Sequence, residues 1–289
     1  MPTTTANGIE LAYELLGDPD GPVLLAVSGL GGQLTDWRAG ALEGLVDQGL
    51  QVLCFDNRDV GASTWFDDAG EPDLVTVLFE PGTPVPYLVA DMAADAAGLL
   101  DALGIDRAHL LGISMGGMIA QQFAIDFPDR TATLTSIMSS PNITVAQPKQ
   151  EALLSLLVAP AEGREAVIDQ SVELSRVIAS PGFPFDDADL RRRAAIHYDR
   201  GHHPAGLLRQ LAAVLASPDR TEGLTALTVP TLVVHGADDP LITLPGGEAT
   251  AAAVPGAELW VVPGMGHDLP AAVLPELSAR VGALVAAST

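Results

Sequence analysis

The sequence is short of cysteine and of long apolar runs, and each shortage excludes a class of protein. Cys54 is the only cysteine among the 289 residues, which excludes an intramolecular disulfide and a cysteine-based metal cluster. It lies in the apolar run 52–55, so we expect a buried structural thiol. No stretch reaches the roughly 18 consecutive apolar residues that a membrane-spanning helix needs.

Basic residues are also scarce, because Lys149 is the only lysine and 14 basic residues face 37 acidic ones, for a formal charge of −23. A chain this acidic repels phosphate backbones and anionic lipid surfaces, so neither nucleic acid nor a membrane is expected as a partner. Residues 1–7 lack the charged and apolar segments of a secretory signal, and we therefore expect a cytoplasmic protein. Nothing in the sequence specifies an oligomeric state.

What is abundant is apolar residues, at 48% of the chain, and they follow two alternating periods. Short apolar runs predict strands at 8–16, 23–27, 51–55, 108–113, 133–138, 231–235 and 257–262. Helical spacing predicts helices at about 37–48, 87–103, 118–124 and 270–287. Strands that alternate with helices predict an α/β protein with a mostly parallel, doubly wound sheet, and the alternating pattern of 8–16 predicts its edge strand.

Two segments interrupt this alternation. Residues 64–86 mix acidic residues with prolines and predict a long surface loop. The gap between the strands 133–138 and 231–235 is far longer than one crossover helix needs, and it holds four helical patterns, at about 149–158, 163–179, 187–199 and 204–216. We therefore expect a core domain formed by residues 1–140 and 221–289, with a helical cap, 141–220, inserted into it.

The pattern Gly-x-Ser-x-Gly at 112–116 stands between an expected strand and an expected helix, the setting of a nucleophile elbow. Such a turn places its serine in a strained conformation and brings strand and helix so close that side chains at 112 and 116 would collide. It would lift the Ser114 hydroxyl clear of the sheet.

A serine hydroxyl becomes a nucleophile only when a base takes its proton and a third group orients that base. In chain order the partners should be an acid and then a histidine, each in a loop after a strand. His267 follows the last expected strand in a glycine-rich turn and is the candidate base. The candidate acid is Asp239 or its neighbour Asp238, and the spacing from Gly236 favours Asp239.

The oxyanion that forms during acyl transfer needs two backbone N–H donors. Met115, directly after Ser114, is the first candidate. The second should come from the loop after strand 23–27, where Leu30 follows the first glycine. Substrate-pocket candidates are Gly29, Trp37 and Met118, and core packing explains Trp37 and Met118 equally well.

Other polar residues receive structural interpretations. Arg58 is expected to brace neighbouring loops by ion pairing. His109 and His235 lie on strands, where a structural role is expected. The remaining histidines lie in the expected cap, where solvation or substrate contact is expected: His197, His202 and His203. No cluster of metal ligands and no phosphate-binding glycine loop is found, so no metal and no cofactor is expected.

Together these motifs resemble the α/β-hydrolase superfamily, and within it the actinobacterial esterases similar to aclacinomycin methylesterase. The likeness extends over most of residues 22–289 and is weakest at 64–86 and 141–180. The segments that carry it are 28–31, 56–63, 112–117, 182–188, 236–240 and 263–267. The resemblance implies an α/β-hydrolase fold, a triad of Ser114, Asp239 and His267, and oxyanion donors at Leu30 and Met115.

One departure concerns the oxyanion loop, where many members of the superfamily carry His-Gly and this chain carries Ser28-Gly29. Because the donors are backbone N–H groups, the hole should survive with different support. The resemblance does not transfer the substrate, because the cap lines the pocket.

The sequence therefore predicts a cofactor-free serine esterase that cleaves a carboxylic ester, such as a methyl ester, of an apolar small molecule through an acyl-enzyme. Lactone hydrolysis, carbon–carbon bond hydrolysis and perhydrolysis are alternatives on the same triad. A ligand receptor that keeps the triad but turns over slowly is the alternative outside enzymes.

Overall fold

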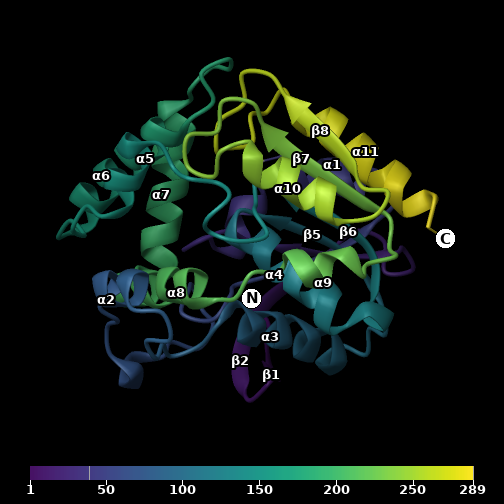
Figure 1. The fold of residues 1–289 in the computed structure, drawn as a ribbon, viewed down its shortest axis with the longest axis horizontal. Helices are drawn as coiled ribbons and strands as arrows, with labels where there is room; N and C mark the ends of the chain where they lie inside the picture. The colour runs from purple at the N-terminus through teal and green to yellow at the C-terminus, as the bar shows by residue number, and fades with distance from the viewer. Residues whose placement is uncertain (39, 289) are drawn as a thin grey trace.

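The computed structural model describes residues 1–38 and 40–288, and within them the chain forms an eight-stranded sheet in the order β1-β2-β4-β3-β5-β6-β7-β8 (Figure 1). The strands are β1 (Thr3–Ala6), β2 (Ile9–Leu16), β3 (Val23–Val27), β4 (Gln51–Phe55), β5 (Ala108–Ile113), β6 (Thr131–Ile137), β7 (Thr231–Gly236) and β8 (Glu258–Val262). β2 pairs antiparallel with β1 and β4, and every other pair is parallel. This confirms the predicted mostly parallel sheet.

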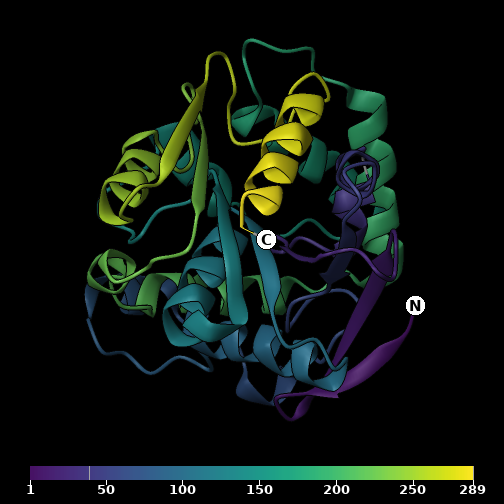
Figure 2. The same cartoon turned by 90° about the vertical axis from the view of Figure 1, so that its right-hand side faces the viewer.

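Helices cover both faces of the sheet (Figure 2). The α-helices are α1 (Ala41–Val46), α2 (Leu74–Phe79), α3 (Val89–Ala102), α4 (Met115–Asp126), α5 (Gln150–Leu156), α6 (Arg164–Ile178), α7 (Asp187–Gly201), α8 (Pro204–Ala216), α9 (Thr221–Thr225), α10 (Pro245–Ala253) and α11 (Leu274–Ala286). The short 3₁₀ helices are η1 (Leu34–Arg38), η2 (Asp67–Ala69) and η3 (Pro128–Arg130). Helices on both faces make the fold doubly wound, as predicted.

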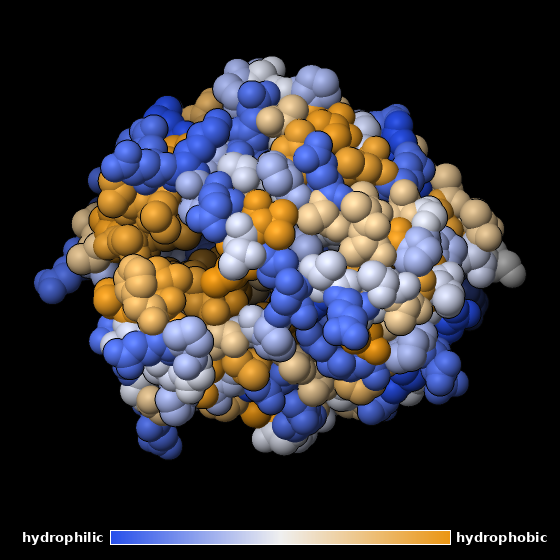
Figure 3. Space-filling view, viewed as in Figure 1, coloured by the Kyte–Doolittle hydropathy of each residue, from blue (hydrophilic) through white to orange (hydrophobic). Residues whose placement is uncertain are grey.

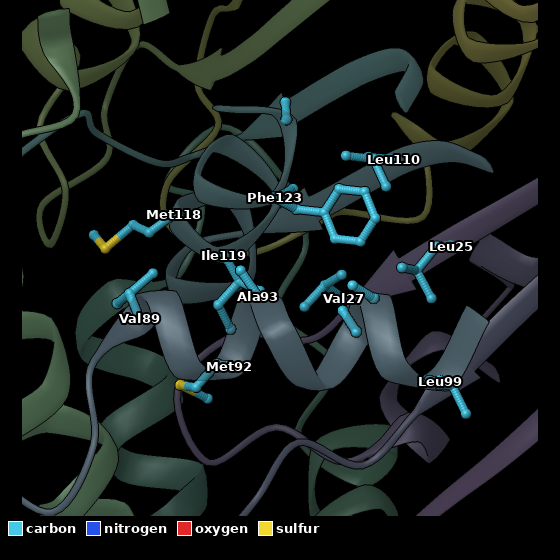
Figure 4. Packing of buried hydrophobic residues seen from close by; sticks show 14 of the residues in the cluster. Leu25, Val27, Val89, Met92, Ala93, Leu99, Leu110, Met118, Ile119 and Phe123 are labelled. Atoms are coloured by element: carbon cyan, nitrogen blue, oxygen red, sulfur yellow. The ribbon is translucent and has the colours of Figure 1, made fainter. Parts of the chain in front are cut away.

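The core is two apolar clusters, one on each face, because successive strand residues point to opposite sides. On β3, Leu25 and Val27 join the cluster under α3 and α4, whereas Leu24 and Ala26 join the cluster under α1 and α11. Figure 4 shows the first cluster, with side chains of α3 and α4 meeting those of the strands. Each large apolar side chain buried in this way contributes about 1.5–3 kcal/mol. Cys54 lies in the second cluster as a buried thiol, as predicted.

Two expectations about local structure were wrong. The segment 8–16 is not the edge strand, because β1 pairs outside it. The sequence did not predict β1, because this strand has only four residues, three of them threonines, and shows no apolar pattern. The segment 64–86 is not one long loop, because it contains η2 and the helix α2. Asp73 begins α2 as its N-cap, accepting hydrogen bonds from the N–H groups of Val75 and Thr76.

Four helices, α5–α8, follow one another between β6 and β7 and stand together at the left of Figure 1. Their bounds all lie within two residues of the predicted helical patterns. None of the helices formed by the described residues is both long enough and apolar enough to cross a bilayer.

Buried ion pairs hold the loop after β4. The Arg209 guanidinium, 1% exposed on α8, donates to both carboxylate oxygens of Asp59 at 2.7 and 2.8 Å, and the Tyr87 hydroxyl donates to the same carboxylate. Burial alone would raise the pKa of Asp59, but these hydrogen bonds and the Phe66 N–H hold that pKa below its usual 3.8. Arg58 is ion-paired as predicted, through Nε at 2.6 Å from the Asp95 carboxylate, although that partner lies on a helix, α3.

We predict that Asp59→Asn destabilises the fold by about 3 kcal/mol, because it removes the closer and fully buried carboxylate of the two that pair with the buried Arg209. Asparagine tolerates the positive φ of 68° at this position, so backbone strain is not added. Urea unfolding measures the loss, and Asp68→Asn, on an exposed carboxylate, should change stability by less than about 0.5 kcal/mol.

The pH dependence of this difference follows from the lowered pKa of Asp59. A depressed folded-state pKa contributes stability above the unfolded pKa, and that contribution is lost as the pH falls through the folded value. The gap between wild type and Asp59→Asn should therefore be constant above about pH 5 and shrink in acid. A gap that stays constant down to about pH 2 would contradict the ion-pair explanation.

Candidate active site

The backbone at Ser114 is strained, with φ 56° and ψ −122°, in the turn between β5 and α4. A Cβ on Gly112 would lie 2.1 Å from the Gly116 carbonyl oxygen, and one on Gly116 would lie 2.1 Å from the Val27 carbonyl oxygen. Strand β5, helix α4 and strand β3 therefore meet backbone to backbone at this point, as the predicted elbow requires. Ser114 is half-buried, with its N–H donating to the Ile137 carbonyl at 2.8 Å.

A continuous chain of hydrogen bonds joins three of the candidate residues. The Ser114 Oγ lies 3.0 Å from Nε2 of His267, and Nδ1 of the same ring lies 2.7 Å from Oδ2 of Asp239. With Nδ1 donating to the carboxylate, Nε2 is left as the acceptor for the serine proton. The other Asp239 oxygen accepts from the N–H groups of Leu241 and Ile242, at 2.8 and 3.0 Å, which fixes the carboxylate.

The neighbouring Asp238 turns away from the histidine. Its Oδ2 accepts a hydrogen bond from the Gly264 N–H at 3.0 Å, and its own N–H donates to the Met265 carbonyl. Asp239, 2% exposed, is therefore the carboxylate that contacts the candidate base. Asp238 links the loop after β7 to the loop after β8.

Two backbone N–H groups beside Ser114 have no hydrogen-bond acceptor among residues 1–38 and 40–288. One belongs to Met115, the first residue of α4, where the helix dipole adds positive potential. The other belongs to Leu30. Its predecessor Gly29 faces the nucleophile, since a Cβ on Gly29 would stand 3.3 Å from Cβ and 3.8 Å from Oγ of Ser114.

Ser28 supports this loop through its side chain and its carbonyl. The Ser28 Oγ accepts a hydrogen bond from the Trp37 indole at 2.8 Å, and its carbonyl accepts one from the Asn57 amide at 3.2 Å. Trp37 packs in the apolar cluster under α1 and α11, at 4% exposure, which favours the core interpretation over the pocket wall. Met118 is likewise a core residue, lying beside Val89 in Figure 4.

Of the other histidines, two are buried in the sheet and two connect separate elements of the fold. His235, fully buried, donates through Nε2 to the Ile242 carbonyl oxygen at 2.7 Å, and burial lowers its pKa. His109 contacts the Thr133 hydroxyl, and burial lowers its pKa too. His197 lies 3.0 Å from Asp36, and His203 stacks on Trp65. The last two join α7 and α8 to core loops, which the sequence interpretation missed.

The loop that carries His267 is held by the segment after α6. The His267 N–H donates to the Ile178 carbonyl at 2.8 Å, and the Gly266 N–H donates to Ser180 Oγ at 2.8 Å. The Ser180 hydroxyl in turn donates to Asp268, whose pKa is raised by burial. No sequence signal pointed to these contacts. Within the described parts of the chain, no group of three or more His, Cys, Asp or Glu side chains is placed to hold a metal ion.

Comparison with known proteins identifies the fold family. The model of the alpha/beta hydrolase fold matches residues 22–157. Rhodomycin D methylesterase of Streptomyces peucetius is 30% identical over the whole of both chains. The 3-oxoadipate enol-lactonase 2 of Acinetobacter baylyi is 29% identical over 85% of this chain and 82% of its own.

The same family appears among solved structures. A hydrolase from Pseudomonas aeruginosa superposes with a TM-score of 0.72 at 28% identity, covering 99% of this chain and 97% of that one. The fold class predicted from the sequence is therefore confirmed. With a relative of 30% identity along its full length and a family model that spans the nucleophile turn, this chain belongs to the α/β-hydrolase family.

Proposed function

We propose that the protein is a serine hydrolase that cleaves a carboxylic ester of an apolar small molecule through an acyl-enzyme. The observation that carries the proposal is the hydrogen-bond chain from Ser114 through His267 to Asp239, on a serine lifted by a strained turn. The name of the methylesterase relative supports an ester substrate, and a methyl ester in particular.

The proposed mechanism follows from the positions of the donors and acceptors. His267 Nε2 takes the hydroxyl proton as Ser114 Oγ attacks the ester carbonyl carbon. The Leu30 and Met115 N–H groups stabilise the oxyanion. The imidazolium, stabilised by Asp239, then protonates the leaving alcohol, and His267 afterwards activates a water molecule that releases the acid and restores the serine.

Residues 141–220 serve in this proposal as a cap over the site. Helices α7 and α8 contact the oxyanion loop through His197 and Leu207, and the C-terminal end of α6 contacts the histidine loop through Ile178. The cap therefore borders the space above Ser114 from two sides, and it is the part of the chain that selects the substrate.

The surface around the cap supports an apolar substrate. Figure 3 shows two orange areas on either side of a hollow, over the region where Figure 1 places α2 and α5–α8. The exposed large apolar side chains of these helices and of the residues after α5 are Val75, Leu78, Phe79, Leu153, Leu154, Leu157, Val158, Ile196 and Leu207. Contiguous exposed apolar surface of this kind is typical of a binding groove.

Lactone hydrolysis is the second candidate, and the enol-lactonase relative favours it. The triad would perform the same attack, with the leaving alcohol still tethered to the acyl group. A non-enzymatic receptor would keep the triad but would not regenerate free Ser114.

We predict that Ser114→Ala lowers ester turnover by about 10⁵-fold or more without loss of folding, because it removes the nucleophile. Turnover is measured on a panel of methyl, p-nitrophenyl and lactone esters, which ranks the two candidate substrates. A fluorophosphonate probe should label wild type at Ser114 and leave the variant unlabelled. Retained esterase activity in the variant would overturn the proposal, and labelling without multiple turnovers on any ester would favour the receptor.

We predict that Asp239→Asn lowers kcat on the order of 10³- to 10⁴-fold, because the amide no longer favours the histidine tautomer that accepts the serine proton. Asp238→Asn is the matched control, since its amide oxygen can still accept from the Gly264 N–H. The control should keep kcat within about threefold of wild type. Equal losses in both variants would contradict the assignment of Asp239.

We predict that Leu207→Ala weakens binding of long-chain esters more than short ones. Leu207 is 39% exposed on α8, and its Cδ1 would lie 2.8 Å from a Cβ on Gly31, so it reaches from solvent to the oxyanion loop. Loss of about 1 kcal/mol of apolar contact should raise KM for p-nitrophenyl octanoate roughly fivefold and that for the acetate less. Leu15→Ala, at 37% exposure on β2, should change neither value.

A further inference from the structure

Gln210, on α8, is a fully buried polar side chain that the proposed mechanism does not use. Its Oε1 accepts a hydrogen bond from the Gly31 N–H at 2.8 Å, and its Nε2 donates to the Arg58 carbonyl at 2.8 Å. One partner can only donate and the other can only accept, so the orientation of the amide is determined by its surroundings. Gln210 thus joins the loop after β3 to the loop after β4.

The Gly31 N–H belongs to a tight turn that carries the candidate oxyanion donor. The Gly32 N–H donates to the Gly29 carbonyl at 3.0 Å, and Gly31 takes φ +66° within the turn. The trans peptide between Gly29 and Leu30 directs its N–H opposite to its carbonyl. With that carbonyl held inside the turn, the Leu30 N–H points outward, next to Ser114.

Two successive N–H groups in this turn therefore have different roles. That of Gly31 is bound by Gln210, and that of Leu30 is left without an acceptor among the described residues. Without Gln210, the partly buried Gly31 N–H and the buried Arg58 carbonyl would lose this partner, at a cost for each. The turn would then relax toward other acceptors and carry the Leu30 N–H with it.

From this geometry we propose that Gln210 is a positioning residue for the oxyanion hole. Its amide holds the Gly29–Gly32 turn in the one orientation that presents the Leu30 N–H to the oxyanion. The proposal rests on the proposed function, because it deepens the role of the same site. It also makes the proposed cap a structural part of the catalytic centre, since the group that orients the donor comes from residue 210.

The rest of the loop is held to the same two helices. The Gln33 side chain donates to the carbonyls of His197 and Gly201, at 3.0 and 3.3 Å, and accepts from Arg200. These contacts lie beyond the turn, on the far side of Gly32, and position the start of η1. Gln210 differs from them because its hydrogen bond is to the turn itself, at the Gly31 N–H.

The test compares an ester with its thionoester, because sulfur is a poor acceptor for an oxyanion hole. We expect Gln210→Leu to lower kcat for p-nitrophenyl butyrate by about 10-fold or more, less than removal of a whole donor, with KM little changed. The rate on the thionoester, which gains little from the hole, should fall less than about threefold. The ester-to-thionoester ratio should therefore fall.

Ser217→Ala is the matched control on the same helix. The Ser217 hydroxyl ends α8 and accepts from the Val89 N–H at 2.9 Å, so its loss loosens α8 without touching the oxyanion loop. The control should lower the thermal midpoint but keep the ester-to-thionoester ratio. Gln210→Met, which has an unbranched side chain, is measured beside Gln210→Leu, so that the test does not depend on the folding of one variant. Circular dichroism shows whether each variant is folded.

An unchanged ratio in a folded, active Gln210 variant overturns this inference and leaves the proposed function intact. A ratio that falls equally in Ser217→Ala also overturns it, because looseness of the helix would then explain the effect. A wild-type protein that hydrolyses neither substrate overturns the proposed function, and the inference with it.

Discussion

The contact of three backbones around Ser114 is the constraint on which the site depends. A side chain at Gly112 or Gly116 would overlap the main chain of α4 or β3, so the strand, the helix and the neighbouring strand can approach only at these glycines. This approach forces Ser114 to a positive φ. The conformational free energy that this backbone strain costs is offset by the packing of the surrounding residues. In return, the hydroxyl stands clear of the sheet and the first N–H of α4 lies beside it.

The parallel strands then bring the remaining parts to the same edge. Leu30 follows β3, Asp239 follows β7 and His267 follows β8, and the carboxyl ends of parallel strands lie at one edge of a sheet. The hydrogen bond between Asp238 and the Gly264 N–H joins two of these loops directly. Residues far apart in the chain therefore form one chain of hydrogen bonds, from Asp239 through His267 to the Ser114 hydroxyl.

Three of the scarce basic residues of this acidic chain pair with buried carboxylates. Arg58, Arg200 and Arg209 pair with carboxylates that are 0–2% exposed, around the loop after β4. Two of the three come from α7 and α8, so these charges tie the inserted helices to the core. Together with the amide of Gln210, these side chains hold the oxyanion loop between the core and the inserted helices.

The sequence by itself determined the sheet, most helix positions and the order of the candidate triad, because these depend on local periodicity and on short motifs. It did not reveal β1 or α2, since a four-residue polar strand and a six-residue helix carry too few apolar positions to show a period. Only the tertiary structure decided between Asp238 and Asp239, placed Trp37 in the core, and brought Gln210 to Gly31. The physical reason is that these outcomes depend on pairings between residues up to 179 positions apart, which no local pattern encodes.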